Sequence, residues 1–301
     1  MSGYTEGIII LLCINFIAAM GVSLLTGFTG IFSLGHAGYM AVGAYTAAIL
    51  TFQYEFNFII AILLGGAIAA ILAYVIGVPT LKLIGDYYAI VSIGLGEAIR
   101  LILENGGTIT RGARGYPGIP PYTTLTVALC FFVVMAFLMF NLINCRFGRA
   151  FKACRDDYIA ASLLGYNTAK YRVLSLVVSA FYCGISGALL GGFLSFVQPI
   201  MFDMIKSTEI TSVVVFGGLG SMTGTLIGTF VITLITELFR PISQYRMLIY
   251  GAILVIIMVI RPEGVMGQQE FGPKMLKLLK RKFFEGVTSR KKVKNLNDKG
   301  I

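Results

Sequence analysis

The side chains best placed to do chemistry in this 301-residue chain are a few ionisable groups inside apolar runs. Ionisable residues within a membrane are costly, and they are usually paired or functional. Glu97 and Arg100 lie three residues apart, as do Glu237 and Arg240, so each pair can neutralise itself on one helix face. We interpret both as local ion pairs in preference to substrate contacts. Glu209 is expected to lack such a partner, which makes it the more suggestive carboxylate.

The single histidine and the five scattered cysteines show no pattern of catalysis or metal binding. His36 has no acidic residue near it in sequence, so a hydrogen-bonded structural role is favoured over a proton relay. The cysteines lack CxxC and Cys/His spacing, and small, buried, reduced side chains explain them better than metal ligands or disulfides. We therefore predict no catalytic residue, no metal site and no cofactor.

Motifs of nucleotide binding and hydrolysis are also absent from the sequence. The chain has no G-x-x-x-x-G-K-[ST] loop, and its nearest glycine cluster, GGLGSMTG at 217–224, contains no lysine. That cluster lies between apolar runs and is predicted to form a tight turn. There is no GxSxG motif, HExxH motif or Ser/Lys dyad. The chain is therefore predicted not to be an enzyme, and any energy source is expected to lie in another chain.

The amino-acid composition indicates whether these residues belong to a soluble protein or to a membrane protein. Hydrophobic residues make up 57% of the chain and charged residues 13%, and the mean hydropathy is +0.85. Soluble domains carry about 25% charged residues, so this is an integral membrane protein. The apolar runs are near span length and do not alternate with polar residues, which predicts helices rather than a barrel. The N-terminal MSGYTEG lacks the basic region of a secretory signal, so the first span is expected to be retained.

The fold class predicted is all-α and polytopic, with about nine transmembrane helices in a range of about eight to ten. The predicted spans lie at residues 7–26, 36–53, 58–79, 86–103, 122–143, 173–197, 204–217, 222–240 and 245–261. The 204–217 run is short for a full crossing, and a half-helix or re-entrant segment is the alternative. Residues 1–267 thus form a predicted transmembrane domain with a cytoplasmic loop at 144–172, and 268–301 form a basic cytoplasmic tail.

The formal net charge of +10 is concentrated in two segments. Residues 146–172 carry six Lys/Arg against two acids, and residues 263–301 carry ten against four. By the positive-inside rule both segments are predicted to be cytoplasmic, which places the N-terminus outside. For the basic tail, contact with membrane lipids is favoured over binding of nucleic acid.

The segment 146–172, RFGRAFKACRDDYIAASLLGYNTAKYR, is the longest polar interruption between the apolar runs. Its charged residues flank a short amphipathic core. On a chain with many spans and no nucleotide site, this pattern is typical of a docking element for a soluble partner.

Glycine patterns predict one broken helix and two packing faces. The run GFTGIFSLGHAGYMAVG at 27–43 resists a continuous helix, because Gly costs about 1 kcal/mol relative to Ala in a helix interior. Irregular backbone at membrane depth needs protein or water to satisfy it, so we expect a broken helix beside a translocation path. Its residues are Gly30, Ser33, Gly35, His36 and Gly38.

Small residues at spacing four let helix backbones approach closely in lipid. This spacing occurs in a GxxxG pair and in a GxxxGxxxG run, formed by Gly187 and Gly191 and by Gly220, Gly224 and Gly228. Packing within the chain is the favoured interpretation of both, and a subunit interface is the alternative.

Six segments together resemble one family of membrane proteins. They are GFTGIFSLGHAGYMAVGAY (27–45), GDYYAIVSIGLGEAIRLIL (85–103), GARGYPGIP (112–120), GRAFKACRDDYIAASLLG (148–165), VVFGGLGSMTGTLIG (214–228) and RPEGVMG (261–267). In this order they resemble the M-type permease of branched-chain amino-acid ABC importers (LivM-like), from about residue 10 to residue 267. The tail beyond residue 270 is outside the resemblance.

The resemblance implies an ABC importer permease fold and a subunit that forms half of a pore for leucine, isoleucine or valine. It implies three kinds of partner in or at a bacterial inner membrane: an H-type permease, two cytoplasmic ATPase subunits and an extracytoplasmic binding protein. The 146–172 loop then resembles the coupling helix that docks in the ATPase. The residues expected to couple are Arg155, Asp156, Asp157, Ala160, Ala161 and Gly165.

Within this loop, Ala160, Ala161 and Gly165 match a shortened form of the general Ala-Ala-x-x-x-Gly permease motif. The acidic residue that usually precedes the alanines is here Ile159, with the two aspartates further upstream.

Two other functions remain open from the sequence. A related importer permease for urea or short amides would share the architecture. A stand-alone secondary carrier or channel would be expected to show paired acids or histidine chains deep in its spans and an inverted repeat, which this sequence does not display.

Overall fold

The computed structural model describes residues 3–83, 85–238 and 251, and it is almost wholly helical. The long helices are α1 (Gly3–Val22) with a π-helical continuation η1 (Ser23–Phe28), α2 (His36–Gln53), α3 (Phe58–Thr80), α4 (Asp86–Glu104), α6 (Leu125–Asn144), α9 (Thr168–Leu194), α10 (Met204–Gly217) and α11 (Met222–Leu238). Each predicted span before residue 239 corresponds to one of these helices within a few residues. The all-α prediction is therefore confirmed, whereas the last predicted span, 245–261, and the basic tail, 268–301, lie outside the described residues apart from residue 251.

Shorter elements fill the connections between the long helices. They are α5 (Gly107–Thr110), η2 (Gly112–Arg114), β1 (Tyr116–Pro117), α7 (Arg146–Asp156), α8 (Tyr158–Leu163), β2 (Phe196–Val197) and η3 (Pro199–Phe202). The two strands pair antiparallel, with Tyr116 opposite Val197. This pairing was not predicted from the sequence, because a two-residue strand is too short to show alternation.

Four of the described helical segments are long and apolar enough to cross a membrane: Gly3–Phe28, α3, α6 and α9. With 14 residues, α10 is about 21 Å long, which is less than the roughly 30 Å hydrocarbon core. The short length predicted for this run is thus present in the structure.

The centre of the molecule is α9, which packs on α1, α2 and α3. Close approach depends on glycine here: a side chain on Gly43 would collide with the backbone of Gly184, and one on Gly187 would collide with the backbone of Met40. Gly191 lies against Val197 and Ala44. The GxxxG pair therefore lies at contacts within the chain.

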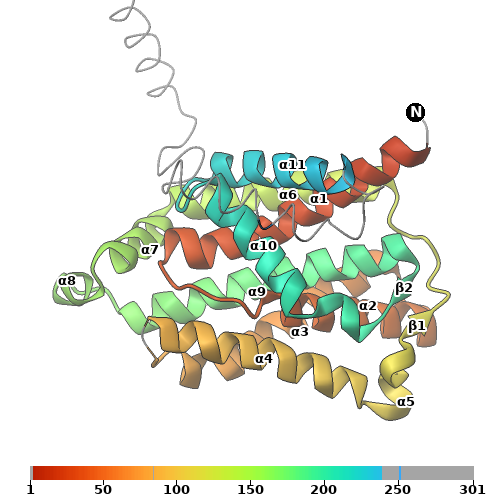
Figure 1. The fold of residues 1–301 in the computed structure, drawn as a ribbon. Coiled ribbons are helices and arrows are strands. Elements are labelled where there is room, and N and C mark those ends of the chain that lie inside the picture. The colour runs from red at the N-terminus through yellow and green to blue at the C-terminus, as the bar shows by residue number, and fades with distance from the viewer. Residues whose placement is uncertain (1–2, 84, 239–250, 252–301) are drawn as a thin grey trace, which may run out of the picture.

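Short connecting elements lie at two opposite ends of the helical bundle (Figure 1). The short helices α7 and α8 lie at one end, where α1 gives way to η1. The opposite end carries α5, the β1–β2 pair and the start of α1. Between these ends, α3 and α6 expose apolar residues over much of their length, as expected of surfaces that meet lipid or another membrane subunit.

Candidate functional site

The polar loop at one end of the bundle forms two helices, and the second, α8, is capped by its own sequence at its N-terminus. Asp157 is the N-cap residue: its Oδ1 accepts hydrogen bonds from the backbone N–H groups of Ile159 (2.8 Å) and Ala160 (3.1 Å). Such a cap satisfies backbone donors that a helix start leaves unpaired. Asp157 therefore fixes where α8 begins.

The C-terminus of α8 is closed by a Schellman motif. The N–H of Tyr166 donates to the carbonyl of Ala161 and the N–H of Gly165 donates to the carbonyl of Ser162, both at 3.1 Å. Gly165 has φ +87°, the left-handed conformation that favours glycine at this position. The Ala-Ala-x-x-x-Gly spacing thus sets the length and end of a short helix, with Ala161 buried beneath it.

Large apolar side chains project from α8 and the residue after it. Leu163 is 84% exposed and Leu164 is 77% exposed, and Tyr158 and Ile159 are also exposed. This patch lies on a polar loop at the end of the bundle rather than along its apolar flanks (Figure 1). Exposed apolar groups that cluster on a polar surface mark an interaction site.

The preceding helix, α7, turns one face inward against η1. Lys152 places its ammonium 5.5 Å from the centre of the Phe28 ring, a cation–π contact. Arg155 donates from Nη1 to the Gly27 carbonyl (3.3 Å) and pairs with Asp156 (3.0 Å). On the same helix, burial raises the pKa of the Cys154 thiol, an effect that Arg172 partly opposes.

Arg155 occupies a space that two glycines leave open. A Cβ on Gly30 would lie 2.9 Å from the Cγ of Arg155, and a Cβ on Gly220 would collide with its Nη1. Gly30 belongs to the segment after η1, and Gly220 belongs to the turn between α10 and α11. Arg155 was predicted as a coupling residue, Gly30 as a pore residue and Gly220 as a packing residue. The structure brings all three into contact, which was not predicted from the sequence.

Residues 29–35 interrupt the helix between η1 and α2, where the glycine-rich run predicted a break. Two of the backbone groups that this break leaves outside a helix are bound by side chains of other helices. The N–H of Leu34 donates to Ser92 Oγ (2.9 Å), and the carbonyl of Ser33 accepts from Thr211 Oγ1 (3.2 Å). Gly35 packs directly on the backbone of Ser92. The break is therefore built into the bundle, between α4 and α10.

His36 begins α2 and is fully buried. Its Nε2 lies 2.9 Å from Ser179 Oγ on α9, and its ring meets Tyr39 edge to face. The hydrogen bond expected of a structural histidine is thus present. Two residues further on, Gly38 lies against the backbone of Gly96 on α4.

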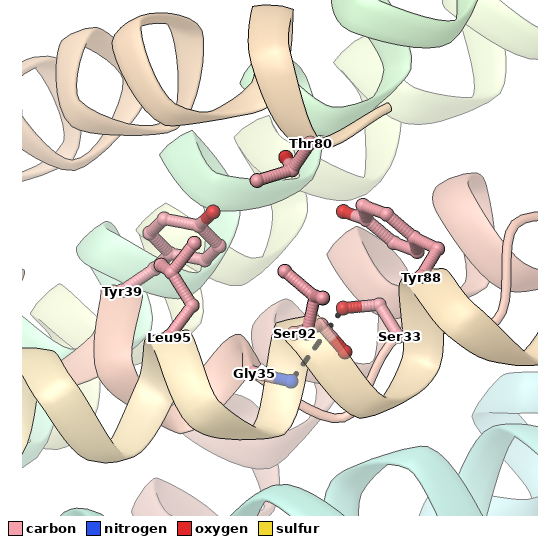
Figure 2. A pocket seen from close by; sticks show the side chains of 8 residues that line it. Ser33, Gly35, Tyr39, Thr80, Tyr88, Ser92 and Leu95 are labelled. Atoms are coloured by element: carbon pink, nitrogen blue, oxygen red, sulfur yellow. Dashed lines mark hydrogen bonds between the residues drawn. The ribbon is translucent and has the colours of Figure 1, made fainter. Parts of the chain in front are cut away.

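A small cavity lies beside the break, with hydroxyl groups around it (Figure 2). Its volume is about 10 Å³, and its lining residues are Ser33, Gly35, Tyr39, Thr80, Tyr88, Val91, Ser92 and Leu95. A space of this size holds about one water molecule. The cavity cannot hold a solute of several heavy atoms in this conformation.

Toward the other end of α4, the predicted ion pair between Glu97 and Arg100 is confirmed and is extended by Glu104, 2.9 Å from Arg100. The expectation that Glu209 lacks a partner is wrong, because Lys206 lies three residues before it and pairs with it at 3.1 Å.

Glu237 accepts a hydrogen bond from the hydroxyl of Tyr4 (2.9 Å), and its expected partner Arg240 lies outside the described residues. Nearer the start of α11, Gly224 and Gly228 both lie against Gly217 of α10, so this glycine run also lies at a contact within the chain.

Several polar residues of these sites escaped the sequence analysis. Tyr88 and Ser92 of the hydroxyl-lined cavity lie one helical turn apart on α4, and this spacing was the available signal. For Lys206 and Glu209 the signal was the same i,i+3 spacing that identified the other ion pairs. In the part of the chain that the structure describes, no three His, Cys, Asp or Glu side chains gather as metal ligands would.

Comparison with known proteins gives a family match over most of the chain. Residues 4–258 match the family model described as branched-chain amino acid transport system / permease component. The chain is 30% identical to the high-affinity branched-chain amino acid transport system permease protein LivM of Escherichia coli, over 87% of this chain and 70% of that protein.

More distant similarity extends to other permeases of the same kind. The chain is 28% identical to the permease protein LivH of Salmonella typhimurium, over 56% of this chain and 55% of that protein. It is 25% identical to BraD of Pseudomonas aeruginosa, over 50% and 49% of the two chains. No solved structure matches significantly.

Proposed function

The chain belongs to the family of branched-chain amino acid transport system permease components, and from this membership we propose that it forms half of a translocation pore for leucine, isoleucine and valine. It is a permease subunit of an ABC importer, a multi-pass protein of the bacterial inner membrane that works with a second permease. ATP hydrolysis belongs to other subunits of such importers. The proposed partners are an H-type permease, two cytoplasmic ATPases and an extracytoplasmic binding protein.

The proposed docking element for the ATPase is α8, and its exposed apolar surface is the observation that carries the proposal. The helix is held at both ends, by Asp157 and by the Schellman motif at Gly165, so it presents Leu163 and Leu164 in a fixed orientation. A fixed apolar surface binds a partner at a lower entropic cost than a flexible loop does. Directly before the predicted coupling residues Ala160 and Ala161, Ile159 stands where the motif usually has an acid, and it adds a further exposed apolar side chain.

In the proposed orientation, α8 and the basic tail face the cytoplasm. The six Lys/Arg of residues 146–172 and the positive-inside rule support this orientation. The start of α1 lies at the opposite end of the bundle from α8, which fits an N-terminus outside the cell (Figure 1).

The proposed mechanism begins when the ATPases close on ATP and displace α8. Because α8 follows α7 after the single residue Asp157, the displacement reaches Arg155 directly. Arg155 contacts both the break after η1 and the turn between α10 and α11, through Gly27, Gly30 and Gly220. We infer that movement of Arg155 shifts these elements together and opens the translocation path expected beside the break.

A permease for urea or short amides remains the second candidate, since the architecture would be the same. The experiment that tests the proposal is uptake of radioactive leucine into proteoliposomes that contain the chain with its H-type permease and ATPases. We expect uptake that requires internal ATP and external binding protein and that excess isoleucine or valine suppresses. Suppression by urea or acetamide, without suppression by isoleucine, would contradict the assignment of substrate.

A further inference from the structure

A groove of about 370 Å³ lies between α4 and the η3–α10 segment, away from the hydroxyl-lined cavity. Its lining residues are Ile93, Glu97, Arg100, Ile200, Asp203 and Met204. Half of these side chains are charged and half are apolar. The volume falls within the range of small-molecule sites, roughly 300 to 1,000 Å³.

The charges at the groove do not balance. Arg100 is shared by Glu97 on its own helix and by Glu104 one turn further on. Asp203 lines the same groove from the η3–α10 side and caps α10, with its Oδ1 accepting from the backbone N–H of Lys206 (3.0 Å). Two carboxylates thus pair with the one guanidinium, and a third lines the same groove. An excess of carboxylate in a membrane domain is stabilised when a cationic group joins it.

The apolar residues of the groove come from both walls. Ile93 lies one helical turn before Glu97 on α4, and Ile200 and Met204 flank Asp203 on the other wall. A ligand in the groove therefore meets carboxylates, one guanidinium and an aliphatic surface together. A branched aliphatic α-amino acid carries the complementary groups on a single carbon: an ammonium, a carboxylate and an apolar side chain.

We propose that this groove is a binding site for the amino acid within the membrane domain, where it waits after the binding protein releases it. The ammonium lies between Glu97 and Asp203, the carboxylate faces Arg100, and the aliphatic side chain lies on Ile93, Ile200 and Met204. This inference rests on the proposed function, because it places the same substrate class at a defined point of the chain.

The test is direct binding of radioactive leucine to the purified complex of both permeases and ATPases in nanodiscs, without the binding protein. The variants Glu97→Gln and Asp203→Asn each remove one charge with little change of shape, and Asn keeps the N-cap of α10. A charge-assisted hydrogen bond is worth enough to weaken Kd by about tenfold or more. The control is Glu55→Gln, an exposed carboxylate in the loop between α2 and α3, and it should bind leucine as the wild type does.

Competition by leucine analogues provides a second measurement, which does not depend on any variant folding correctly. Leucinamide lacks the carboxylate and 4-methylpentanoate lacks the ammonium, so both should compete at least about tenfold less well than isoleucine. Met204→Ala should weaken binding of leucine more than binding of alanine, because it removes apolar surface from the groove.

The inference is overturned if the wild-type complex binds no leucine without the binding protein, or if Glu97→Gln and Asp203→Asn bind it unchanged. These results leave the proposed function intact as long as the wild-type complex still takes up leucine with ATP and binding protein. Failure of that uptake would instead overturn the proposed function and this inference with it.

Discussion

At the scale of single residues, Arg155 lies against other elements of the bundle rather than on the outer surface of the loop. The charged run predicted a contact with the ATPase, whereas the side chain is only 20% exposed and points into the bundle. There it donates to the Gly27 carbonyl and packs against Gly30 and Gly220. The sequence identifies Arg155 as a charged residue but does not show where its side chain points. That direction depends on Gly30 and Gly220, which are far from Arg155 along the chain.

Arg155→Gln should therefore uncouple ATP hydrolysis from transport. The shorter, neutral side chain cannot make the same contacts with Gly27 and Asp156, so α8 can move without moving the break. In the reconstituted complex we expect the ratio of leucine transported to ATP hydrolysed to fall about tenfold, a loss that corresponds to roughly 1.4 kcal/mol. Arg149→Gln, an exposed residue of the same helix, should keep the wild-type ratio. An unchanged ratio in Arg155→Gln would exclude this transmission route.

Ser92 is the residue on which the break most clearly depends. Its hydroxyl accepts from Leu34 N–H, and loss of this acceptor leaves a partly buried donor unpaired. Ser92→Ala should therefore destabilise the complex by about 1–3 kcal/mol, measured by thermal unfolding in detergent. The exposed Ser162→Ala serves as the control. Equal stability of both variants would mean that another group satisfies the break.

At the scale of elements, apolar periodicity and run length located the helices well, and local chemistry explains why. Asn57, Thr124 and Asn167 cap α3, α6 and α9, and an apolar run follows each of them directly or within six residues. The break at 29–35 was also visible, because glycine signals it locally. The β1–β2 pair and the ion pair of Lys206 with Glu209 were missed. The strand pair joins residues about 80 positions apart, so no local pattern predicts it. The ion pair has the same i,i+3 spacing as Glu97 with Arg100, and this spacing was its only signal in the sequence.

The C-terminal cap of α8 allows a test of whether the backbone conformation at Gly165 controls docking to the ATPase. Gly165 needs a positive φ, which costs an L-residue about 1–2 kcal/mol except where Asn can adopt it. Gly165→Ala should weaken association with the ATPase subunits, whereas Gly165→Asn should largely retain it. Co-purification of tagged ATPase with each variant measures this. If Ala and Asn behave alike, the conformation at Gly165 does not control docking.

At the scale of the whole molecule, the distribution of charge predicts which end faces the cytoplasm. Leu164, directly after α8, and Tyr54, in the loop between α2 and α3, are both exposed and suit substitution by cysteine. Tyr54 follows Gln53, which binds Tyr116 of β1, and β1 and α8 lie at opposite ends of the bundle (Figure 1). In a background without the five native cysteines, a membrane-impermeant maleimide should label Tyr54→Cys in intact spheroplasts. It should label Leu164→Cys only in inside-out vesicles. The reverse pattern would invert the proposed orientation.

The central claim is that this chain is one permease within a larger importer whose energy comes from other subunits. Purification of the tagged chain from bacterial membranes in mild detergent, with mass spectrometry of the proteins recovered, tests it most directly. We predict recovery of a second permease and of ATPase subunits, and loss of the ATPases alone when Leu163→Asp places a charge on the exposed surface of α8. A homo-oligomer of this chain that transports leucine when reconstituted by itself would contradict the claim.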